Sequence, residues 1–295
     1  MLRRILIGLA VAVAAAAGFV GYRAYRFFHT ETVKLDDRFY VVLGGGGNTA
    51  ILIADDGVLV VDTKFLRPGH ALAAQIKELT DKPVKVIINT HYHADHTHGN
   101  PNYARGTEVI AHRHTRQHLL TLDKDYWESE PNWSLLPGDL LDDERELHFG
   151  DETIRLLHPG RGHTDGDIVV HFTRRGIVHT GDLFLHDMYP LIDHAGGGNA
   201  HEWPASLDKV LALTDVHTYI PGHGALSTRQ DVERFREYLG SLVAQVDAQV
   251  AAGQSLAQLT PRIDLHGFAF QGIPFRTSQA RNIALVYEET TGKKK

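Results

Sequence analysis

The chain has 295 residues, a formal net charge of −6 at pH 7, and no cysteine. This length allows one large domain or two small ones, and a hydrophobic content of 43% is ordinary for a globular core. The negative charge argues against nucleic acid as the main partner, because contact with phosphates requires a basic face. Without cysteine, neither a disulfide framework nor a thiol metal ligand is available.

Residues 1–26 have the pattern of a segment that directs export. Arg3 and Arg4 precede residues 5–20, which carry no charge. A basic start before such an apolar run is typical of a signal peptide. The run is slightly shorter than the roughly 20 residues of a membrane span, so the pattern leaves cleavage and membrane anchoring open. We therefore expect a periplasmic or membrane-tethered domain outside the cytoplasm, and we interpret residues 27–36 as a linker.

The first half of the chain is predicted to be rich in β-strands, from its apolar runs and turn residues. The expected strands are residues 39–43, 48–54, 58–61 and 84–88, with a return to the sheet within 102–110 and a helix at 68–79. Residues 112–146 are polar and irregular. Such a segment is typical either of a lid or pocket wall or of a surface insertion.

The second half repeats this plan. Strands are expected at residues 147–149, 153–157, 168–172, 177–180 and 216–220, and helices at 202–213, after a capping-box candidate at Ser227, and at 278–289. In each half, a strand that ends in aspartate is followed by a helix and by an apolar strand that ends in histidine. The repetition predicts a single domain at residues 37–295 of the α/β (α+β) class. Its expected architecture is a four-layer αββα sandwich of two mixed sheets flanked by helices.

A dense cluster of metal-binding side chains follows the predicted strand at residues 84–88. Within eight residues stand His91, His93, Asp95, His96 and His98. In extended backbone His91 and His93 point the same way, because side chains two apart share a face. Imidazole nitrogens and carboxylates are ligands that zinc prefers. The cluster offers more ligands than one catalytic metal with an open position needs, which suggests two metals side by side.

The pattern His-x-His-x-Asp-His at a strand end resembles the signature of the metallo-β-lactamase superfamily. The other motifs of that family occur in order, as Asp62 after an early strand, His163 in Gly-His-Thr, Asp182 in Gly-Asp and His223 in Gly-His-Gly. The resemblance covers residues 37 to about 240. It implies the sandwich fold that the internal repetition also predicts.

The resemblance implies a role for each of these residues. One metal would be held by His91, His93 and His163, a second by Asp95, His96 and His223, with Asp182 as a bridge and Asp62 as a structural support for the metal-binding loop. Two zinc ions per chain are expected, although iron or manganese suits the same ligands. A water shared by the two ions would ionise near neutral pH and attack the substrate, with Asp95 holding it in line.

The implied activity is hydrolysis of a small ester, thioester, lactone, amide or phosphoester. Aspartate at position 182 is typical of glyoxalase II-like, lactonase and phosphodiesterase branches, whereas true zinc β-lactamases have cysteine or another residue there. Three alternatives stay open. They are β-lactam hydrolysis, the redox chemistry of the similar persulfide dioxygenases, which bind one iron at positions equivalent to His91, His163 and Asp182, and a non-catalytic binding role.

Residues near the motifs supply candidates for further roles. Tyr189 and His194 lie between Asp182 and His223, in a segment that often borders the substrate in this superfamily, and we predict substrate contact for both. Asp165 and Asp167 follow His163 closely, and either orient ligand histidines or serve in a turn. The oligomeric state is not indicated by the sequence.

Overall fold

The computed structural model describes residues 29–130, 132–273 and 276–292. The export segment predicted at residues 1–26 lies outside the described residues, so export stays a prediction. Within the described ranges, no helix is both long and apolar enough to cross a membrane.

The first sheet has seven strands in the order β1-β2-β3-β4-β5-β6-β7. They are β1 (Thr30–Lys34), β2 (Phe39–Gly44), β3 (Thr49–Ile53), β4 (Val58–Val61), β5 (Val84–Ile88), β6 (Glu108–His112) and β7 (Asp139–Leu141). Strands β1 to β4 pair antiparallel, and β4 to β7 pair parallel. The parallel half places the carboxyl ends of β4 and β5 side by side at one edge of the sheet.

The linker predicted at residues 27–36 is wrong for its central part. Strand β1 pairs with β2 from Thr30 opposite Gly44 to Lys34 opposite Tyr40. Its sequence, Thr-Glu-Thr-Val-Lys, has one apolar residue and no buried position, so it lacked the apolar pattern of a strand. A short, polar strand of this kind is typical of the edge of a sheet.

The second sheet has five strands in the order β12-β11-β10-β9-β8. They are β8 (Glu144–Phe149), β9 (Glu152–Leu157), β10 (Val169–Phe172), β11 (Ile177–Leu185) and β12 (Thr218–His223). All neighbours pair antiparallel except β11 and β12. The two sheets pack face to face through buried apolar side chains. Among them, the rings of Phe39 and Phe172 meet edge to face with centroids 4.8 Å apart.

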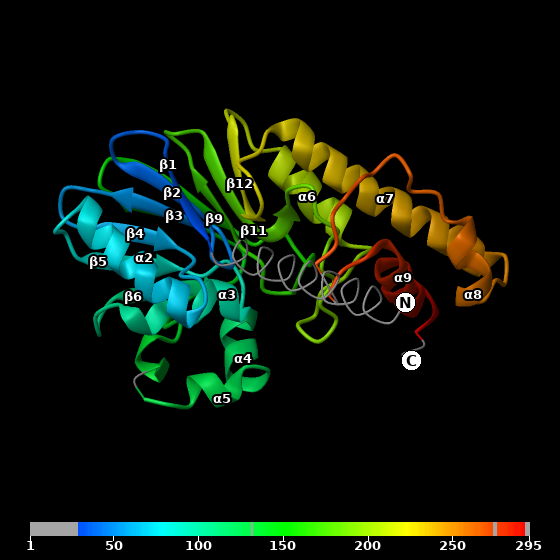
Figure 1. Ribbon diagram of the computed structural model, residues 1–295, viewed down its shortest axis with the longest axis horizontal. Helices are drawn as coiled ribbons and strands as arrows, with labels where there is room; N and C mark the ends of the chain where they lie inside the picture. Colours follow the sequence, from blue (N-terminus) through cyan, green and yellow to red (C-terminus); the bar gives the residue numbers. More distant parts are fainter. Residues whose placement is uncertain (1–28, 131, 274–275, 293–295) are drawn as a thin grey trace, which may run out of the picture.

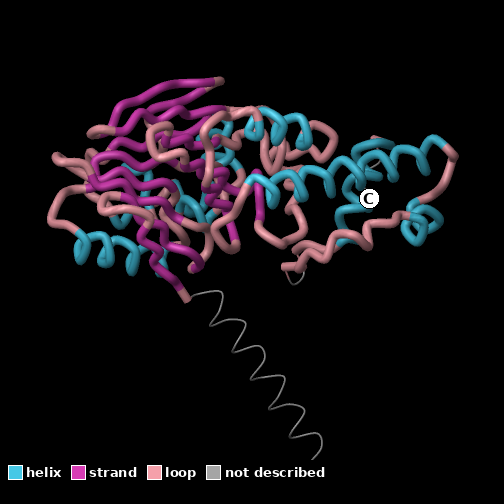
Figure 2. The backbone as a smooth tube through the Cα atoms, turned by 90° about the horizontal axis from the view of Figure 1, so that it is seen from above, coloured by secondary structure: helices cyan, strands magenta, loops and turns pink. Residues whose placement is uncertain are grey.

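Helices cover the outer faces of both sheets (Figure 1). Leu72 and Ile76 of α2 (Leu66–Leu79) pack on the first sheet, against residues that include Ile51 and Val60. Helices α6 (Trp203–Leu211) and α7 (Arg229–Ala251) pack on the second sheet, and α9 (Gln279–Thr291) packs against α7 in the same large apolar cluster. The predicted αββα sandwich is confirmed. In Figure 2 the helices at the carboxyl end extend well to one side of the strands.

The long helix α7 begins one residue later than the sequence pattern predicted. Its capping box is formed by Thr228 and Asp231, not by Ser227 and Gln230. The Ser227 hydroxyl instead donates to the Ala225 carbonyl, at 2.9 Å. The remaining short helices are α3 (Ala94–Thr97), α8 (Leu256–Leu259), and the single turns η1 (Asn100–Asn102) and η3 (Thr260–Arg262).

The segment predicted to be irregular, residues 112–146, contains short helices and strands. It holds α4 (Arg113–Thr121), α5 (Lys124–Trp127) and η2 (Asn132–Leu135) before strands β7 and β8. Leu119 and Trp127 are fully buried and pack with Leu136 against Tyr92, which stands inside the metal-binding motif. The segment therefore supports the motif from outside the two sheets.

Candidate metal centre

The seven predicted metal ligands come from five places in the sequence and meet at one edge of the sandwich. His91 and His93 follow β5, Asp95 and His96 lie in α3, His163 lies between β9 and β10, and Asp182 and His223 belong to β11 and β12. Two glycines permit this approach. A Cβ at Gly222 would lie 1.9 Å from Asp182 Oδ1, and one at Gly181 would lie 2.5 Å from Thr90 Oγ1. A side chain at Gly222 would therefore displace Asp182, and one at Gly181 would displace Thr90, which precedes His91.

The ligand atoms form two groups, in each of which all atoms lie within 4.8 Å of one another. The first group consists of His91, His93, His163 and Asp182, and the second of Asp95, His96 and His223. The structure thus brings all seven residues together in the two sets that the resemblance implied. Their function as metal ligands stays a prediction.

Asp182 stands between the two groups. Its Oδ1 lies 3.2 Å from His96 Nε2 and 3.4 Å from His223 Nε2. Its Oδ2 lies 3.7 Å from His163 Nε2 and 4.0 Å from His91 Nε2. One carboxylate therefore presents one oxygen to each group, which is the arrangement that a bridging ligand requires.

Unpaired polar atoms show that the site fits metal ions. Buried side-chain nitrogens and oxygens in proteins normally have a hydrogen-bond partner. Within the described residues, His91 Nε2, His96 Nε2 and Asp182 Oδ1 are buried and have none. All three atoms face the cluster, where a cation would satisfy them. The donor set, imidazole nitrogen with carboxylate oxygen, suits zinc and related divalent ions.

Comparison with known proteins identifies the family. Residues 43–223, more than half of the chain, match the metallo-β-lactamase superfamily. The chain belongs to this superfamily. The 2,4-dinitroanisole O-demethylase subunit alpha of Nocardioides sp. (strain JS1661) is 27% identical over 72% of this chain and 62% of its own length. The metallo-beta-lactamase type 2 of Bacillus cereus is 25% identical over 62% of this chain and 68% of its own length.

Solved structures share the fold at lower identity. The sec-alkylsulfatase Pisa1 from Pseudomonas sp. aligns with a TM-score of 0.77 and 14% identity over 89% of this chain and 50% of its own. The metallo-beta-lactamase from Pontibacter korlensis aligns with a TM-score of 0.62 and 20% identity over 72% of this chain and 99% of its own. The relatives with these names are enzymes. The chain spans only part of the demethylase subunit and half of the alkylsulfatase.

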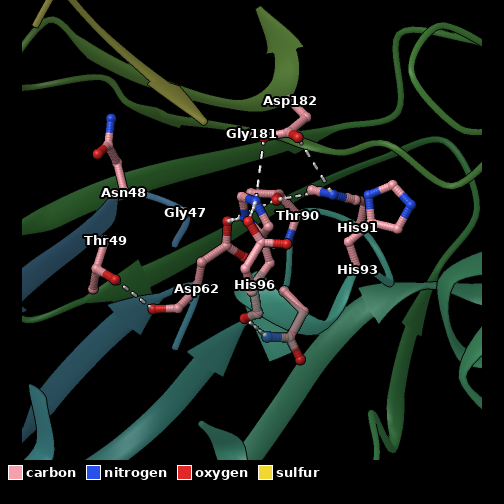
Figure 3. A network of polar contacts seen from close by, with 12 residues as sticks. Gly47, Asn48, Thr49, Asp62, Thr90, His91, His93, His96, Gly181 and Asp182 are labelled. Atoms are coloured by element: carbon pink, nitrogen blue, oxygen red, sulfur yellow. Dashed lines mark hydrogen bonds and ion pairs between the residues drawn. The ribbon is translucent and has the colours of Figure 1, made fainter. Parts of the chain in front are cut away.

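Asp62, the first superfamily motif, supports the second group through a hydrogen bond to His96 (Figure 3). Its Oδ2 accepts hydrogen bonds from His96 Nδ1 at 2.6 Å and Thr90 Oγ1 at 2.7 Å, and its Oδ1 accepts from the Thr90 backbone N–H at 2.8 Å. Because the His96 proton is on Nδ1, its Nε2 lone pair faces the cluster. Thr90 Oγ1 in turn accepts from His91 Nδ1 at 3.1 Å, so Asp62 also influences the first group.

Lys64 supports the second group through the glycine loop between β2 and β3. The Lys64 side chain is fully buried, and its Nζ donates to the carbonyls of Val42, Gly44 and Gly47 at 3.0, 2.5 and 2.7 Å. The Gly47 N–H donates to the Asp95 carbonyl, and a Cβ at Gly47 would lie 2.3 Å from the His96 ring. Burial lowers the pKa of Lys64 to about 7, against the opposing effect of nearby carboxylates. The sequence pattern gave no signal for this lysine.

The first group depends on a different part of the chain. His163 Nδ1 donates to the Leu191 carbonyl at 2.6 Å, and His93 Nε2 donates to Asp193 Oδ2 at 3.0 Å. The Tyr92 hydroxyl donates to the same Asp193 oxygen. These bonds leave His163 Nε2 and His93 Nδ1 facing the cluster, 2.9 Å apart. Sequence reasoning missed Asp193, because a single aspartate in a loop is common and its partners lie about one hundred positions earlier.

The two groups also differ in electrostatics. Burial lowers the pKa of His91 well below 6.5, and burial together with His93 lowers that of His163 to about 4. These imidazoles are neutral and present lone pairs at neutral pH. Burial also lowers the pKa of His223, but Asp182 and Asp95 outweigh it and raise the value to about 9. The carboxylates of Asp182 and Asp95 therefore favour positive charge at the second group, as they would with a cation bound there.

The two predicted substrate-contact residues have partners away from the ligand atoms. The Tyr189 ring lies 5.8 Å from that of Tyr238 and 6.0 Å from that of Phe270, in the aromatic part of the helical layer. His194 Nε2 bonds to Glu289 Oε1 at 2.8 Å. Substrate contact by either residue stays a prediction.

The aspartates after His163 support its loop rather than the ligand nitrogens. Asp167 accepts from the Thr164 backbone N–H at 3.0 Å and from its hydroxyl at 2.5 Å, which favours the turn role. Asp165 accepts from His118 Nε2 at 2.7 Å and so joins this loop to α4.

Proposed function

We propose that this protein is a metal-dependent hydrolase that holds two zinc ions and directs water onto a small ester, thioester, lactone, amide or phosphoester. The observation that carries the proposal is the position of Asp182, with one oxygen toward each ligand group. When bound, the two ions would polarise the substrate and lower the pKa of a water molecule toward neutrality.

The ligand side chains differ in their exposure to solvent. The side chains of His91, His96 and His163 are 1% exposed or less. Those of His93, His223 and Asp95 are 20%, 15% and 12% exposed, so the substrate approaches from their side. We assign all of these residues to binding the ions, and the three partly exposed ones also to the face on which water and substrate meet.

Asp95 is the candidate for handling the proton of the attacking water. Burial raises its pKa, but His96 and His223 outweigh this effect and hold the pKa below the ordinary value of 3.8. Its carboxylate is therefore ionised at neutral pH. Its Oδ2 lies 3.1 Å from His223 Nε2, which fixes the carboxylate beside the second group. An ionised, oriented and partly exposed carboxylate suits a base that accepts a proton or aligns a water.

The names of the relatives suggest which substrate classes to test. Their names refer to an aryl methyl ether, to β-lactams and to secondary alkyl sulfates. These substrates share a polar single bond to a leaving oxygen or nitrogen, and the ester and lactone classes that we propose share it too. The complete second group, with Asp95, His96 and His223 in place, favours two ions over the single iron of a dioxygenase.

Hydrolysis of a substrate panel tests this proposal. Purified protein loaded with zinc is assayed on esters, thioesters, lactones, phosphodiesters, β-lactams, 2,4-dinitroanisole and secondary alkyl sulfates. We expect turnover of at least one class, its loss on chelation and its recovery when zinc is returned. The proposal fails if zinc-loaded protein turns over none of them, or if chelator-treated protein that retains no metal is equally active. Oxygen uptake with a persulfide would instead support the redox alternative.

A further inference from the structure

The loop at residues 190–202, between β11 and α6, contributes the outer hydrogen-bond partners of two first-group histidines. Leu191 provides the carbonyl for His163, and Asp193 provides the carboxylate for His93. The loop also lies directly against the backbone of the third motif. Asp193 N–H donates to the His163 carbonyl at 3.2 Å, and a Cβ at Gly198 would lie 2.2 Å from that same oxygen. A shift of this loop would therefore turn both rings.

The far end of this loop is fixed by one carboxylate from the carboxyl-terminal helix. Glu289 of α9, 9% exposed, accepts from His194 Nε2 at 2.8 Å and from His201 Nδ1 at 2.6 Å. It also accepts from the backbone N–H groups of Ala200 and His201, at 2.9 and 3.3 Å. All of these donors belong to the loop. Burial raises the pKa of Glu289, but these donors hold it below 4.5, so the carboxylate is ionised.

The attachment of α9 to the rest of the protein does not depend on Glu289. Ile283 and Val286 of α9 are buried in the large apolar cluster with Leu239 and Leu242 of α7. The hydroxyl of Thr290 donates to Asp247 of α7 at 2.6 Å. Loss of the Glu289 charge therefore releases the loop while α9 keeps its place. This separates a role in positioning from a role in folding.

We propose that Glu289 is a positioning residue for the first metal group, and that α9 acts as a clamp on the 190–202 loop. The inference rests on the proposed function, since it concerns metal binding by His93 and His163. Glu289 lies outside residues 43–223, which match the superfamily, so none of the motifs includes it. Through the loop, the clamp keeps Leu191 and Asp193 in place and sets the direction of the two ring nitrogens that face the metal.

The test compares Glu289→Gln with Glu288→Gln in the full chain. In the described part of the chain, Glu288 has no hydrogen bond to the loop, so it is a control for loss of a charge on α9. Zinc affinities are measured by competition with a chromophoric chelator, and folding by circular dichroism. Partners of ligand histidines typically change metal affinity by about 10–100-fold. Because Glu289 acts on these partners from one step further away, we expect a loss at the low end of this range, about tenfold, for one of the two ions in Glu289→Gln, with Glu288→Gln like the wild type.

The outcomes separate this inference from the proposed function. If the folded Glu289→Gln variant binds both ions with wild-type affinity, the clamp is refuted and the hydrolase proposal stands. If the wild type itself binds no metal, the proposed function fails first. Should Glu289→Gln not fold, His194→Ala removes only one donor to the carboxylate. We then expect a smaller loss of affinity for the same single ion, and unchanged affinities for both ions would overturn the inference.

Discussion

The two ligand groups share Asp182 but are built in different ways. The second group is supported from within the first sheet, by the fully buried pair of Asp62 and His96 and by the lysine-braced glycine loop. The outer partners of His93 and His163 come instead from a loop near the surface, where Asp193 is 15% exposed. We infer that the sheet holds the ligands of the second group rigidly, whereas the rings of His93 and His163 in the first group can shift with the loop. Loss of a single contact should therefore have different effects in the two groups.

The largest effect is expected where the two groups meet. Asp182→Ala removes the one carboxylate that presents an oxygen to both groups. Loss of a bridging ligand to catalytic ions removes several kcal/mol of transition-state stabilisation, so turnover should fall by at least about 10³-fold. Metal content, measured by mass spectrometry, should fall to fewer than two ions per chain. Two ions and normal turnover in this variant would show that Asp182 is not a bridge.

Lys64→Met tests whether the second group depends on its buried lysine. The variant leaves the carbonyls of Val42, Gly44 and Gly47 without their donor. Each unpaired buried group is destabilising by about 1–3 kcal/mol, which the relief of burying a charge partly offsets. We expect a net loss of roughly 2–4 kcal/mol in the free energy of unfolding, measured with urea. A variant as stable as the wild type would mean that the glycine loop holds its shape without Lys64.

Asp62→Asn and Asp193→Asn each remove a carboxylate that bonds to a ligand histidine, one in the second group and one in the first. Asp62 bonds to His96 directly and to His91 through Thr90. Asp62→Asn should therefore lower the zinc affinity of both groups, by about 10–100-fold for the second group. The Asp193 carboxylate bonds to His93 alone among the ligands, so Asp193→Asn should lower the affinity for one ion by about tenfold. Chelator competition measures both. Equal effects of the two variants on both ions would remove the distinction between the groups.

The smallest effect concerns pH and the clamp on the first group. Burial lowers the pKa of His201, but Glu289 and Asp247 outweigh it and raise the value above 6.5. A raised pKa means that the His201 contribution to stability is full below 6.5 and is lost as pH rises through the folded value. The pKa of Glu289 is lowered from 4.5, so its contribution is lost only as pH falls below that.

The difference in Tm between wild type and His201→Gln measures this effect. His201 faces Glu289 on α9, Asp247 on α7 and the hydroxyl of Thr290, and its side chain is 31% exposed. With this exposure we expect His201 to contribute no more than about 1 kcal/mol to the free energy of unfolding. The difference in Tm should be larger at about pH 6 than at about pH 8.5. An equal difference at both values would show that the imidazole charge does not contribute to the clamp.

The sequence predicted the sandwich and the ligand set because both follow local patterns. Apolar strands can be predicted from their composition. Four ligands lie in or directly after such strands, namely His91, His93, Asp182 and His223. The polar edge strand β1 and the helices within residues 112–146 were missed, because their burial depends on neighbours rather than on their own composition. Propensity is a weak guide where packing decides.

The supports of the site were harder to predict than its ligands. Asp62 was predicted because it belongs to an ordered set of motifs. Lys64, Asp193 and Glu289 were not, since each is an ordinary charged residue until the fold brings distant backbone groups to it. Glu289, for example, bonds to residues almost ninety positions earlier in the chain. Such contacts follow from the tertiary structure and have no local sequence pattern.

Metal stoichiometry tests the central claim most directly. The 295-residue chain, purified without added metal and then titrated with zinc, is measured by native mass spectrometry beside Asp182→Ala and the Glu288→Gln control. The two ligand groups predict two zinc ions per wild-type chain and per Glu288→Gln chain, and fewer in Asp182→Ala. A folded wild-type chain that takes up no metal, or that saturates at one ion, would contradict the account of two groups joined by one carboxylate.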